Sequence, residues 1–183
     1  MIGSLWFKSY AAGNGAAAAY ELISTVFGTG STSTVTFTSI PQTYKHLQVR
    51  FASNANYLNG SNPWMQFNGD TAANYAWHVL SSDGTSVTSG ATPSTTWMLV
   101  GRLPNNGAVQ QVGISVIDIL DYTSTTKNKT IRSLGGTSST ADRYIRMNSG
   151  VWLSTAAVTS LTLSNDAASW PTTSRFSLYG VRG

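Results

Sequence analysis

Hydrophobic and polar residues alternate along most of the chain from Tyr20 onward, in short runs bounded by turn-forming residues. The clearest run is 46–51, in which Leu47, Val49 and Phe51 share one face and polar residues occupy the other. A period of two places successive side chains on opposite faces of an extended strand. Each such run therefore predicts a strand with one buried face.

Short runs of this kind recur at the spacing of turns, and no segment shows the pattern of an amphipathic helix. The expected strands are, in chain order, 22–27, 35–40, 46–51, 64–67, 74–80, 97–100, 109–120, 127–134, 144–147, 158–164 and 174–181. No internal repeat separates them, which argues against a propeller or solenoid. The pattern predicts an all-β fold, a single antiparallel β-sandwich that is jelly-roll-like.

Local signals add detail to two connections and one strand. Asn68-Gly69 is a hairpin-type turn signal between two expected strands. The hydroxyl-rich segment 81–96, with a turn at Asp83-Gly84, is expected to be a polar connection. Within 109–120 apolar residues occupy both faces, which predicts either a bulge or a strand buried on both sides.

The first twenty residues differ from the rest. Leu5, Trp6 and Phe7 form an apolar cluster, followed by a segment rich in alanine and glycine that is too short for an isolated helix. We interpret 1–20 as an attachment arm that docks on a neighbouring subunit or another protein, and 21–183 as the β-sandwich domain. The alternative is an arm that folds back on its own domain.

Composition narrows the class of protein. A chain of 183 residues can bury one sizeable core, and it has no cysteine, which excludes disulfides and thiolate metal sites. Only 10% of residues are charged, so hydroxyl and amide side chains carry solubility, as suits a protein that packs against copies of itself. The net charge of +4 is scattered, which does not favour nucleic-acid binding. No apolar run is long enough for a membrane helix, and 1–7 lacks the pattern of an export signal.

Candidate chemistry is sparse, and we predict no catalytic residue, cofactor or metal. The two histidines, His46 and His78, lie in strand patterns without the setting of a catalytic triad. Asp118 and Asp121, together with Asp142 or Asp166, could supply oxygen ligands for a hard cation, although aspartates at strand ends usually cap turns.

The aromatic residues are more informative. Trp77 and Trp97 lie in expected strands and are assigned to the core. Tyr57, Trp64 and Trp170 lie in or beside polar loops, among amide, carboxylate and hydroxyl side chains. Such aromatics serve subunit interfaces or sugar binding, and we favour an interface or the core.

Several longer stretches carry a resemblance to a known group of proteins. They are YELISTVF at 20–27, VTFTSIPQTYKHLQVRF at 35–51, MQFNGDTAANYAWHVL at 65–80, IDILDYTSTTKNKTIRS at 117–133, GVWLSTAAVTSLTLSNDAASW at 150–170 and RFSLYGV at 175–181. In this order they resemble a small family of virion structural proteins of tailed bacteriophages, especially phages of aquatic bacteria. The first twenty residues lie outside the resemblance.

The resemblance implies a non-enzymatic virion protein, made in the host bacterial cytoplasm and displayed on the particle as a head decoration or cement protein or as a tail appendage. It implies a homo-oligomer, a trimer by analogy with a dimer left open, that contacts other virion proteins. One alternative is a receptor-binding tail-fibre module in which loops 53–63 and 81–96, with Tyr57, contact a host glycan. The other is a virion-borne glycan depolymerase, which the scarcity of acidic residues disfavours.

Overall fold

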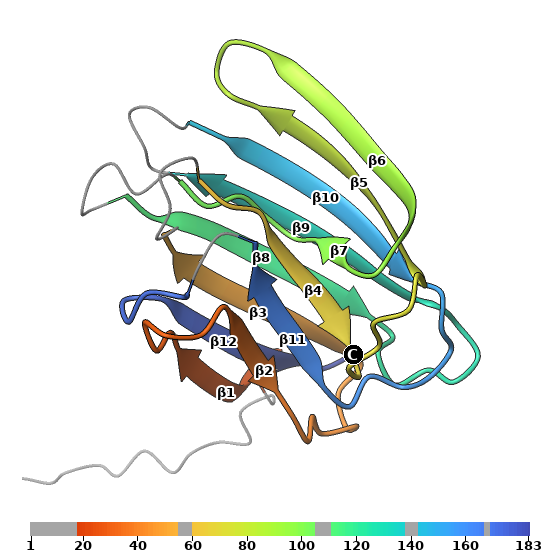
Figure 1. Cartoon of the computed structure of the whole chain (residues 1–183). Helices are drawn as coiled ribbons and strands as arrows, with labels where there is room; N and C mark the ends of the chain where they lie inside the picture. The colour runs from red at the N-terminus through yellow and green to blue at the C-terminus, as the bar shows by residue number, and fades with distance from the viewer. Residues whose placement is uncertain (1–17, 55–59, 105–110, 138–142, 167–168) are drawn as a thin grey trace, which may run out of the picture.

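The computed structural model describes residues 18–54, 60–104, 111–137, 143–166 and 169–183 (Figure 1). These residues form twelve strands in two antiparallel sheets, and they include no helix. Across the described ranges there is accordingly no helix with the length and apolar character needed to span a membrane. The all-β prediction is confirmed, and the two sheets give a β-sandwich-like arrangement.

The larger sheet has eight strands. In spatial order they are β1 (Tyr20–Phe27), β12 (Arg175–Val181), β3 (His46–Ser53), β8 (Gly113–Leu120), β9 (Lys129–Thr137), β10 (Ile145–Trp152), β5 (Tyr75–Ser82) and β6 (Val87–Thr95). The smaller sheet has the order β2 (Thr34–Phe37), β11 (Leu161–Asn165), β4 (Pro63–Phe67) and β7 (Met98–Leu99). β1 begins at Tyr20, the last residue of the expected arm, and residues 1–17 lie outside the described ranges.

One hydrophobic core lies between the two sheets. The alternation in β3 is confirmed, because Leu47, Val49 and Phe51 are all buried. Their partners on the smaller sheet include Met65 and Leu163, which face the same core. Among the described residues, both sheets contribute buried residues to this one core, as the length of the chain predicts.

β8 has neither the bulge nor the burial on both faces that the sequence predicted for 109–120. Its pairing with β3 and with β9 runs without a register shift, so there is no bulge. Ile117 and Ile119 are fully buried, whereas Ile114 and Val116 are 58% and 39% exposed. β8 is therefore buried on one face only, and its second apolar face points away from the core.

The turn at Asn68-Gly69 forms, with φ of 53° and 67°, but it does not make the expected hairpin. It joins β4 of the smaller sheet to β5 of the larger one. The side-chain oxygen of Asn68 accepts hydrogen bonds from the backbone N–H groups of Thr159 and Ser160. These bonds hold the turn against the segment before β11, so the chain crosses between sheets here.

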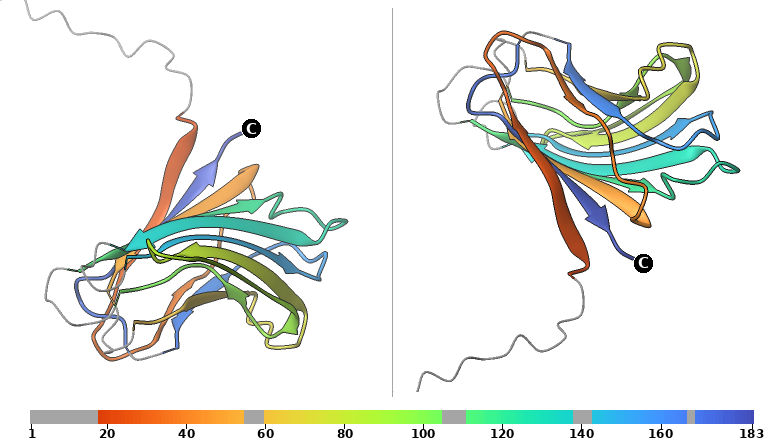
Figure 2. Two further views of the ribbon diagram at one scale, coloured as in Figure 1. Left: turned by 90° about the horizontal axis from the view of Figure 1, so that it is seen from above. Right: turned by 90° about the horizontal axis from the view of Figure 1, so that it is seen from below.

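The segment expected as a polar connection, 81–96, forms the β5–β6 hairpin instead. Its turn at Asp83-Gly84 is confirmed: the Asp83 carboxylate accepts hydrogen bonds from the N–H groups of Thr85 and Ser86, both at 2.8 Å. No residue of β6 is buried. The hairpin forms one end of the larger sheet and extends past the smaller sheet (Figures 1 and 2). The strand expected at 97–100 is reduced to the two residues of β7.

Candidate interaction surfaces

An apolar surface covers much of the outer face of the larger sheet, the face turned away from the core. Val116 of β8, Leu134 of β9, Met147 of β10 and Leu80 of β5 lie directly opposite one another across four adjacent strands. Directly opposite residues share one face of a sheet. All four side chains are exposed, from 39% for Val116 to 55% for Leu134.

A second row runs beside the first. Ile114, Gly136, Ile145, Ser82 and Val87 follow one another from β8 to β6. Ile145 and Val87 are 64% and 70% exposed. The two rows, together with Val112 next to Ile114, are called the apolar face below.

The apolar face is not flat but contains a hollow. A hollow of about 320 Å³ is lined by Val112, Ile114, Gly136, Thr137, Tyr144 and Ile145. A Cβ added at Gly136 would meet nothing closer than 3.5 Å, so the glycine leaves open space at this point. The branched side chains around it form the rim. The surface thus presents both protruding side chains and a recess.

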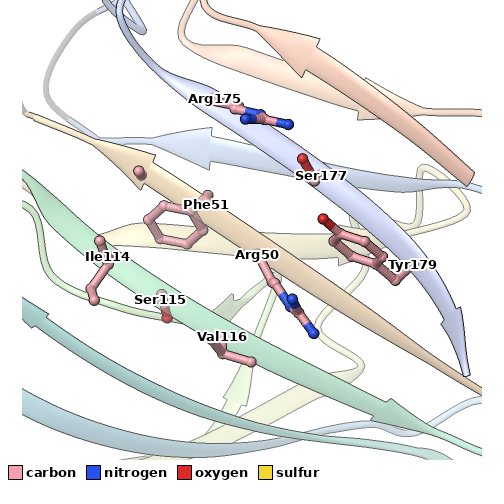
Figure 3. Close-up of a pocket in the computed structure, with 9 residues that line it drawn as sticks. Arg50, Phe51, Ile114, Ser115, Val116, Arg175, Ser177 and Tyr179 are labelled. Carbon is pink, nitrogen blue, oxygen red and sulfur yellow. The ribbon is translucent and has the colours of Figure 1, made fainter. Parts of the chain in front are cut away.

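Beyond Val116 the same outer face becomes cationic and aromatic. The Arg50 guanidinium lies 5.1 Å from the ring centroid of Tyr20 and 4.6 Å from that of Tyr179. Its Nε donates a hydrogen bond to Gln48. Arg50, Tyr179 and Arg175 line a hollow of about 310 Å³ that reaches Ile114 and Val116 (Figure 3). This hollow joins the cationic half of the outer face to the apolar half.

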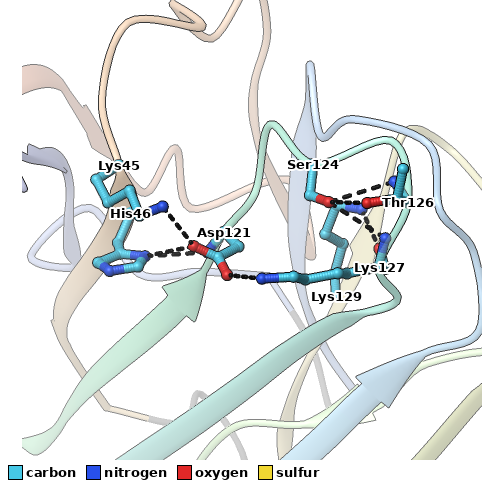
Figure 4. Close-up of polar contacts among 7 residues, drawn as sticks. All are labelled: Lys45, His46, Asp121, Ser124, Thr126, Lys127 and Lys129. Atoms are coloured by element: carbon cyan, nitrogen blue, oxygen red, sulfur yellow. Dashed lines mark hydrogen bonds and ion pairs between the residues drawn. The ribbon is translucent and has the colours of Figure 1, made fainter.

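The aspartates considered for a cation are paired with basic side chains instead. Asp121 lies 3.3 Å from Nζ of Lys45 and accepts a hydrogen bond from Nζ of Lys127 at 3.0 Å (Figure 4). Hydrogen bonds from the amine of Lys127, which has the larger effect, and from the amine of Lys45 hold the pKa of Asp121 below its usual value. Asp118 accepts hydrogen bonds from Arg132 and from Gln48. Both carboxylates therefore already neutralise cationic side chains, which does not favour the cation alternative.

Of the other two acidic residues considered for a cation, only Asp166 is described, and it lies apart from Asp118 and Asp121. Asp142 lies outside the described residues, and Asp166 lies at the other sheet, following β11. In the part of the chain that the structure describes, no three His, Asp or Glu side chains form a group that could hold a metal ion. His46 Nδ1 accepts a hydrogen bond from the backbone N–H of Asp121 at 3.0 Å, which is a structural role. His78 is exposed on the outer face opposite Ser149.

A cleft containing three tryptophans lies where the larger sheet extends past the smaller one. Trp97, just before β7, lies 5.9 Å from Trp77 of β5, with the rings stacked at 15°. Its centroid is 6.1 Å from that of Trp64 of β4. All three indoles are half-buried. With Val79 and Leu99 they line a cavity of about 380 Å³, called the tryptophan cleft below.

Polar side chains form the rest of the cleft wall. Nη1 of Arg146 donates hydrogen bonds to Oδ1 of Asn62 at 2.8 Å and to the carbonyl of Gly101 at 3.0 Å. The backbone N–H and the side-chain amide of Asn62 both donate to the Asp166 carboxylate. Ser61 donates to the same carboxylate at 2.6 Å. The guanidinium, the amide and the carboxylate are therefore held in one connected network.

Of the aromatic residues singled out in the sequence, Trp64 and Trp170 lie in different surroundings. Trp64 lies in the cleft, half-buried and beside a carboxylate and an amide, as its surroundings in the sequence indicate. Trp170 is fully buried and contacts the ring of Phe176 at 4.7 Å. A ligand or subunit on the surface cannot reach it, so of the two places favoured for Trp170, an interface or the core, the structure shows the core. Tyr57, and Leu5, Trp6 and Phe7 of the arm, lie outside the described residues.

Trp77 and Trp97 are the functional candidates that the sequence placed differently. Both were assigned to the core because they lie in apolar runs, yet both line the cleft. The signal for a core position was sound for Trp77, whose side chain is on the inner face of its sheet. The overhang of that sheet, which leaves the inner face open at this end, is a tertiary property that the local pattern does not contain.

Comparisons of the chain with protein-family models, with curated proteins and with solved structures found no match.

Proposed function

We propose that the protein is a non-enzymatic structural protein of a tailed-phage virion, a jelly-roll-like sandwich displayed on the particle as a head decoration protein or a tail appendage. In this proposal it works as a homo-oligomer. The sequence motifs suggest the class of particle. The apolar face is the observation that supports assembly into multiple copies.

The apolar face is too hydrophobic to be explained by scattered exposed residues. Eight of its side chains are at least 39% exposed and lie on neighbouring strands. Contiguous exposed patches of this kind mark interaction sites in soluble proteins. Covering them removes apolar surface from water, which contributes about 25 cal/mol per Å² of buried area.

A second copy of the chain is the occupant that the surface favours. The two rows from Val116 to Leu80 and from Ile114 to Val87 contain no charged residue. Burial of these two rows against an identical surface would therefore desolvate no charge within them, and charge desolvation is the usual obstacle to such contacts. The same face carries protruding side chains such as Met147 and a hollow at Gly136, so one copy offers both parts of a packed contact.

The geometry of the contact decides the symmetry. If the apolar face packs on itself, the assembly closes as a dimer, because an isologous contact is two-fold. If it packs on a different surface of its neighbour and the rotation closes, a ring such as the expected trimer follows. The mass of the oligomer in solution separates the two.

The test is the mass of the full chain by sedimentation velocity, for the natural protein and for Leu134→Asp/Met147→Asp. We expect the natural protein to be a multiple of 19.5 kDa and the double variant to be a monomer. Leu22→Asp, 52% exposed on the edge strand β1, is the matched control and keeps the natural mass. A monomeric natural protein, or equal loss of mass in the control, would contradict assembly through the apolar face.

A second measurement addresses the particle. Full-length protein and protein lacking 1–17, which leaves β1 intact, are mixed with purified phage heads and sedimented. Head binding that needs the arm supports a decoration protein anchored through Leu5, Trp6 and Phe7. Failure of both forms to bind heads supports the tail appendage. The glycan-binding module stays an alternative that the tryptophan cleft favours, and a depolymerase would be recognised by release of sugar.

A further inference from the structure

We infer that the tryptophan cleft binds a neutral pyranose sugar, with the indoles as the apolar wall and Asp166, Asn62 and Arg146 as the hydrogen-bonding wall. The inference concerns the receptor-binding form of the proposed function, but it is independent of assembly through the apolar face. Two kinds of surface, one apolar and one that can form hydrogen bonds, meet in this cavity.

The size of the cavity suits a small polar ligand. Its volume of about 380 Å³ lies at the lower end of the range for small-molecule sites, about 300 to 1,000 Å³. One or two sugar rings fit such a space, whereas a nucleic-acid strand or a helix would not. The cleft thus favours the end of a glycan or a short segment of one.

The indoles remain accessible although packing could have buried them. Trp152 and Trp170 of the core are 2% and 0% exposed, whereas Trp64, Trp77 and Trp97 are each half-buried and line the cavity. Indole combines a large apolar surface with a polar N–H group, which suits a ligand that is apolar on one side and wet on the other. A pyranose ring is such a ligand, because its C–H groups form an apolar face and its hydroxyls point outward from the ring.

The polar wall is prearranged to receive hydroxyls. The Asp166 carboxylate is exposed and accepts bonds from Ser61 and Asn62, yet each carboxylate oxygen has more than one lone pair. Arg146 and Asn62 are fixed by the same network, so a ligand need not order them on binding. Hydroxyl groups can donate to the carboxylate and accept from the guanidinium and the amide.

The charges of the wall select the class of ligand. A purely apolar molecule would remove water from the Asp166 carboxylate without replacing its hydrogen bonds, which is costly. A phosphate or a uronic acid would gain from Arg146 but would meet the carboxylate of Asp166 in the same wall. One cation beside one anion favours a neutral sugar.

The cleft stays open when the apolar face is covered. Residues of a strand alternate between faces, so Trp77 and Val79 of β5 point toward the cleft whereas Leu80 points to the apolar face. Arg146 of β10 and its neighbours Ile145 and Met147 divide in the same way. An oligomer assembled through the apolar face would display one cleft for each copy, so weak single sites would add up through avidity.

The experiment is titration of the full chain with glucose, galactose, mannose, N-acetylglucosamine and their disaccharides, followed by tryptophan fluorescence. We expect saturable binding of at least one neutral sugar. Asp166→Asn should weaken it about tenfold or more, because a charge-assisted hydrogen bond is lost. Asp118→Asn, a paired carboxylate on the opposite face of the larger sheet, is the matched control and should bind as the natural protein does.

Trp64→Ala removes the aromatic wall, and its circular-dichroism spectrum and melting temperature check that it folds. Loss of sugar binding in a folded Trp64→Ala variant supports the site. No binding of any neutral sugar, binding of glucuronate alone, or unchanged binding in both Asp166→Asn and Trp64→Ala would overturn the inference. The oligomer mass and head binding are measured separately, so failure here leaves the test of the proposed function intact.

Discussion

The Asp70 carboxylate accepts a hydrogen bond from Nε1 of Trp152 at 2.7 Å, which ties the crossing between the two sheets to the end of β10. Asn74 and the backbone N–H of Ala72 donate to the same carboxylate. The ring of Trp152 in turn stacks on Tyr75 at 6.3 Å. One acidic side chain thus orients an indole of the core and stabilises the loop that leads into β5.

Asp70→Asn should lower the free energy of unfolding by about 1–3 kcal/mol, because the buried indole N–H and its neighbours lose a charged acceptor. Urea unfolding followed by tryptophan fluorescence measures the change. Asp118→Asn, whose partner Arg132 is largely exposed, should change stability by less than about 1 kcal/mol. Equal effects of the two substitutions would contradict the role of Asp70.

The stability of the fold should also depend on Asp70 at acidic pH. Hydrogen bonds from Asn74, then from Trp152, hold the pKa of Asp70 below its usual value of 3.8. The unfolded chain therefore binds the proton first as pH falls, and the stability from Asp70 is present above pH 3.8 and lost below it. Unfolding measured at a series of pH values should show that Asp70→Asn loses less stability at acidic pH than the natural protein does. Identical pH profiles would count against this account.

Trp170→Ala should destabilise the fold by about 3–5 kcal/mol, the range for removing a large aromatic side chain from a packed core. Trp170 fills the space beside Phe51 and Phe176, at ring distances of 6.5 and 4.7 Å. Trp170→Phe keeps part of this volume and should cost less. The midpoint of urea unfolding gives both values, and a near-neutral Trp170→Ala would place this residue at a surface instead.

Gly180→Ala should cost about 1–3 kcal/mol, as overpacking does. A Cβ at this position would come within 2.3 Å of the Tyr44 ring, so β12 or the ring must shift. Gly136→Ala is the control, because its Cβ would meet nothing closer than 3.5 Å. Thermal unfolding of the two variants should separate them clearly, and a stable Gly180→Ala would show that the ring moves freely.

The buried amine of Lys129 should give a slope at alkaline pH. Burial lowers the pKa of Lys129 below its usual 10.5, and Nζ donates to the carbonyls of Lys127 and Thr155. The unfolded chain then holds this proton to higher pH than the folded chain, so stability rises with pH toward 10.5. Unfolding between about pH 8 and 9.5 measures the slope, which Lys129→Met should reduce. Burial raises the pKa of Tyr75 from its usual 10.0 to about 12. Stability from Tyr75 is therefore lost only as pH rises past 10.0, where the unfolded chain ionises first, which is above this range.

The sequence predicted the strands well where burial on one face decided the pattern. β3 and β12 lie close to their expected bounds because every second residue meets the core. β6 was missed because its residues are hydroxyl-rich and none is buried, so it carries no apolar alternation. Its place in the sheet follows from pairing with β5, a contact that local patterns do not encode.

The candidate surfaces were harder to predict for the same reason. The apolar residues of β8 on both faces were noticed, but a sequence cannot tell a second buried face from an exposed one. Trp64 was singled out by its polar neighbours, and one of them, Asn62, does line the cleft. The cleft also needs Asp166 and Arg146, which follow Trp64 by about a hundred and about eighty positions in the chain, so only the fold brings them together.

The unequal width of the two sheets has a further consequence for how the molecule opens. β6 pairs only with β5 and buries none of its residues, so little free energy holds it beyond its backbone hydrogen bonds. Segments with few buried contacts open locally without unfolding the whole protein. β5, which carries Trp77 and Val79 of the tryptophan cleft, is the strand that β6 borders, whereas Trp64 and Leu99 belong to the smaller sheet. Local opening of β6 would free one edge of β5, so the wall of the cleft formed by Trp77 and Val79 could adjust to ligands of slightly different shape while the wall formed by the smaller sheet stays in place.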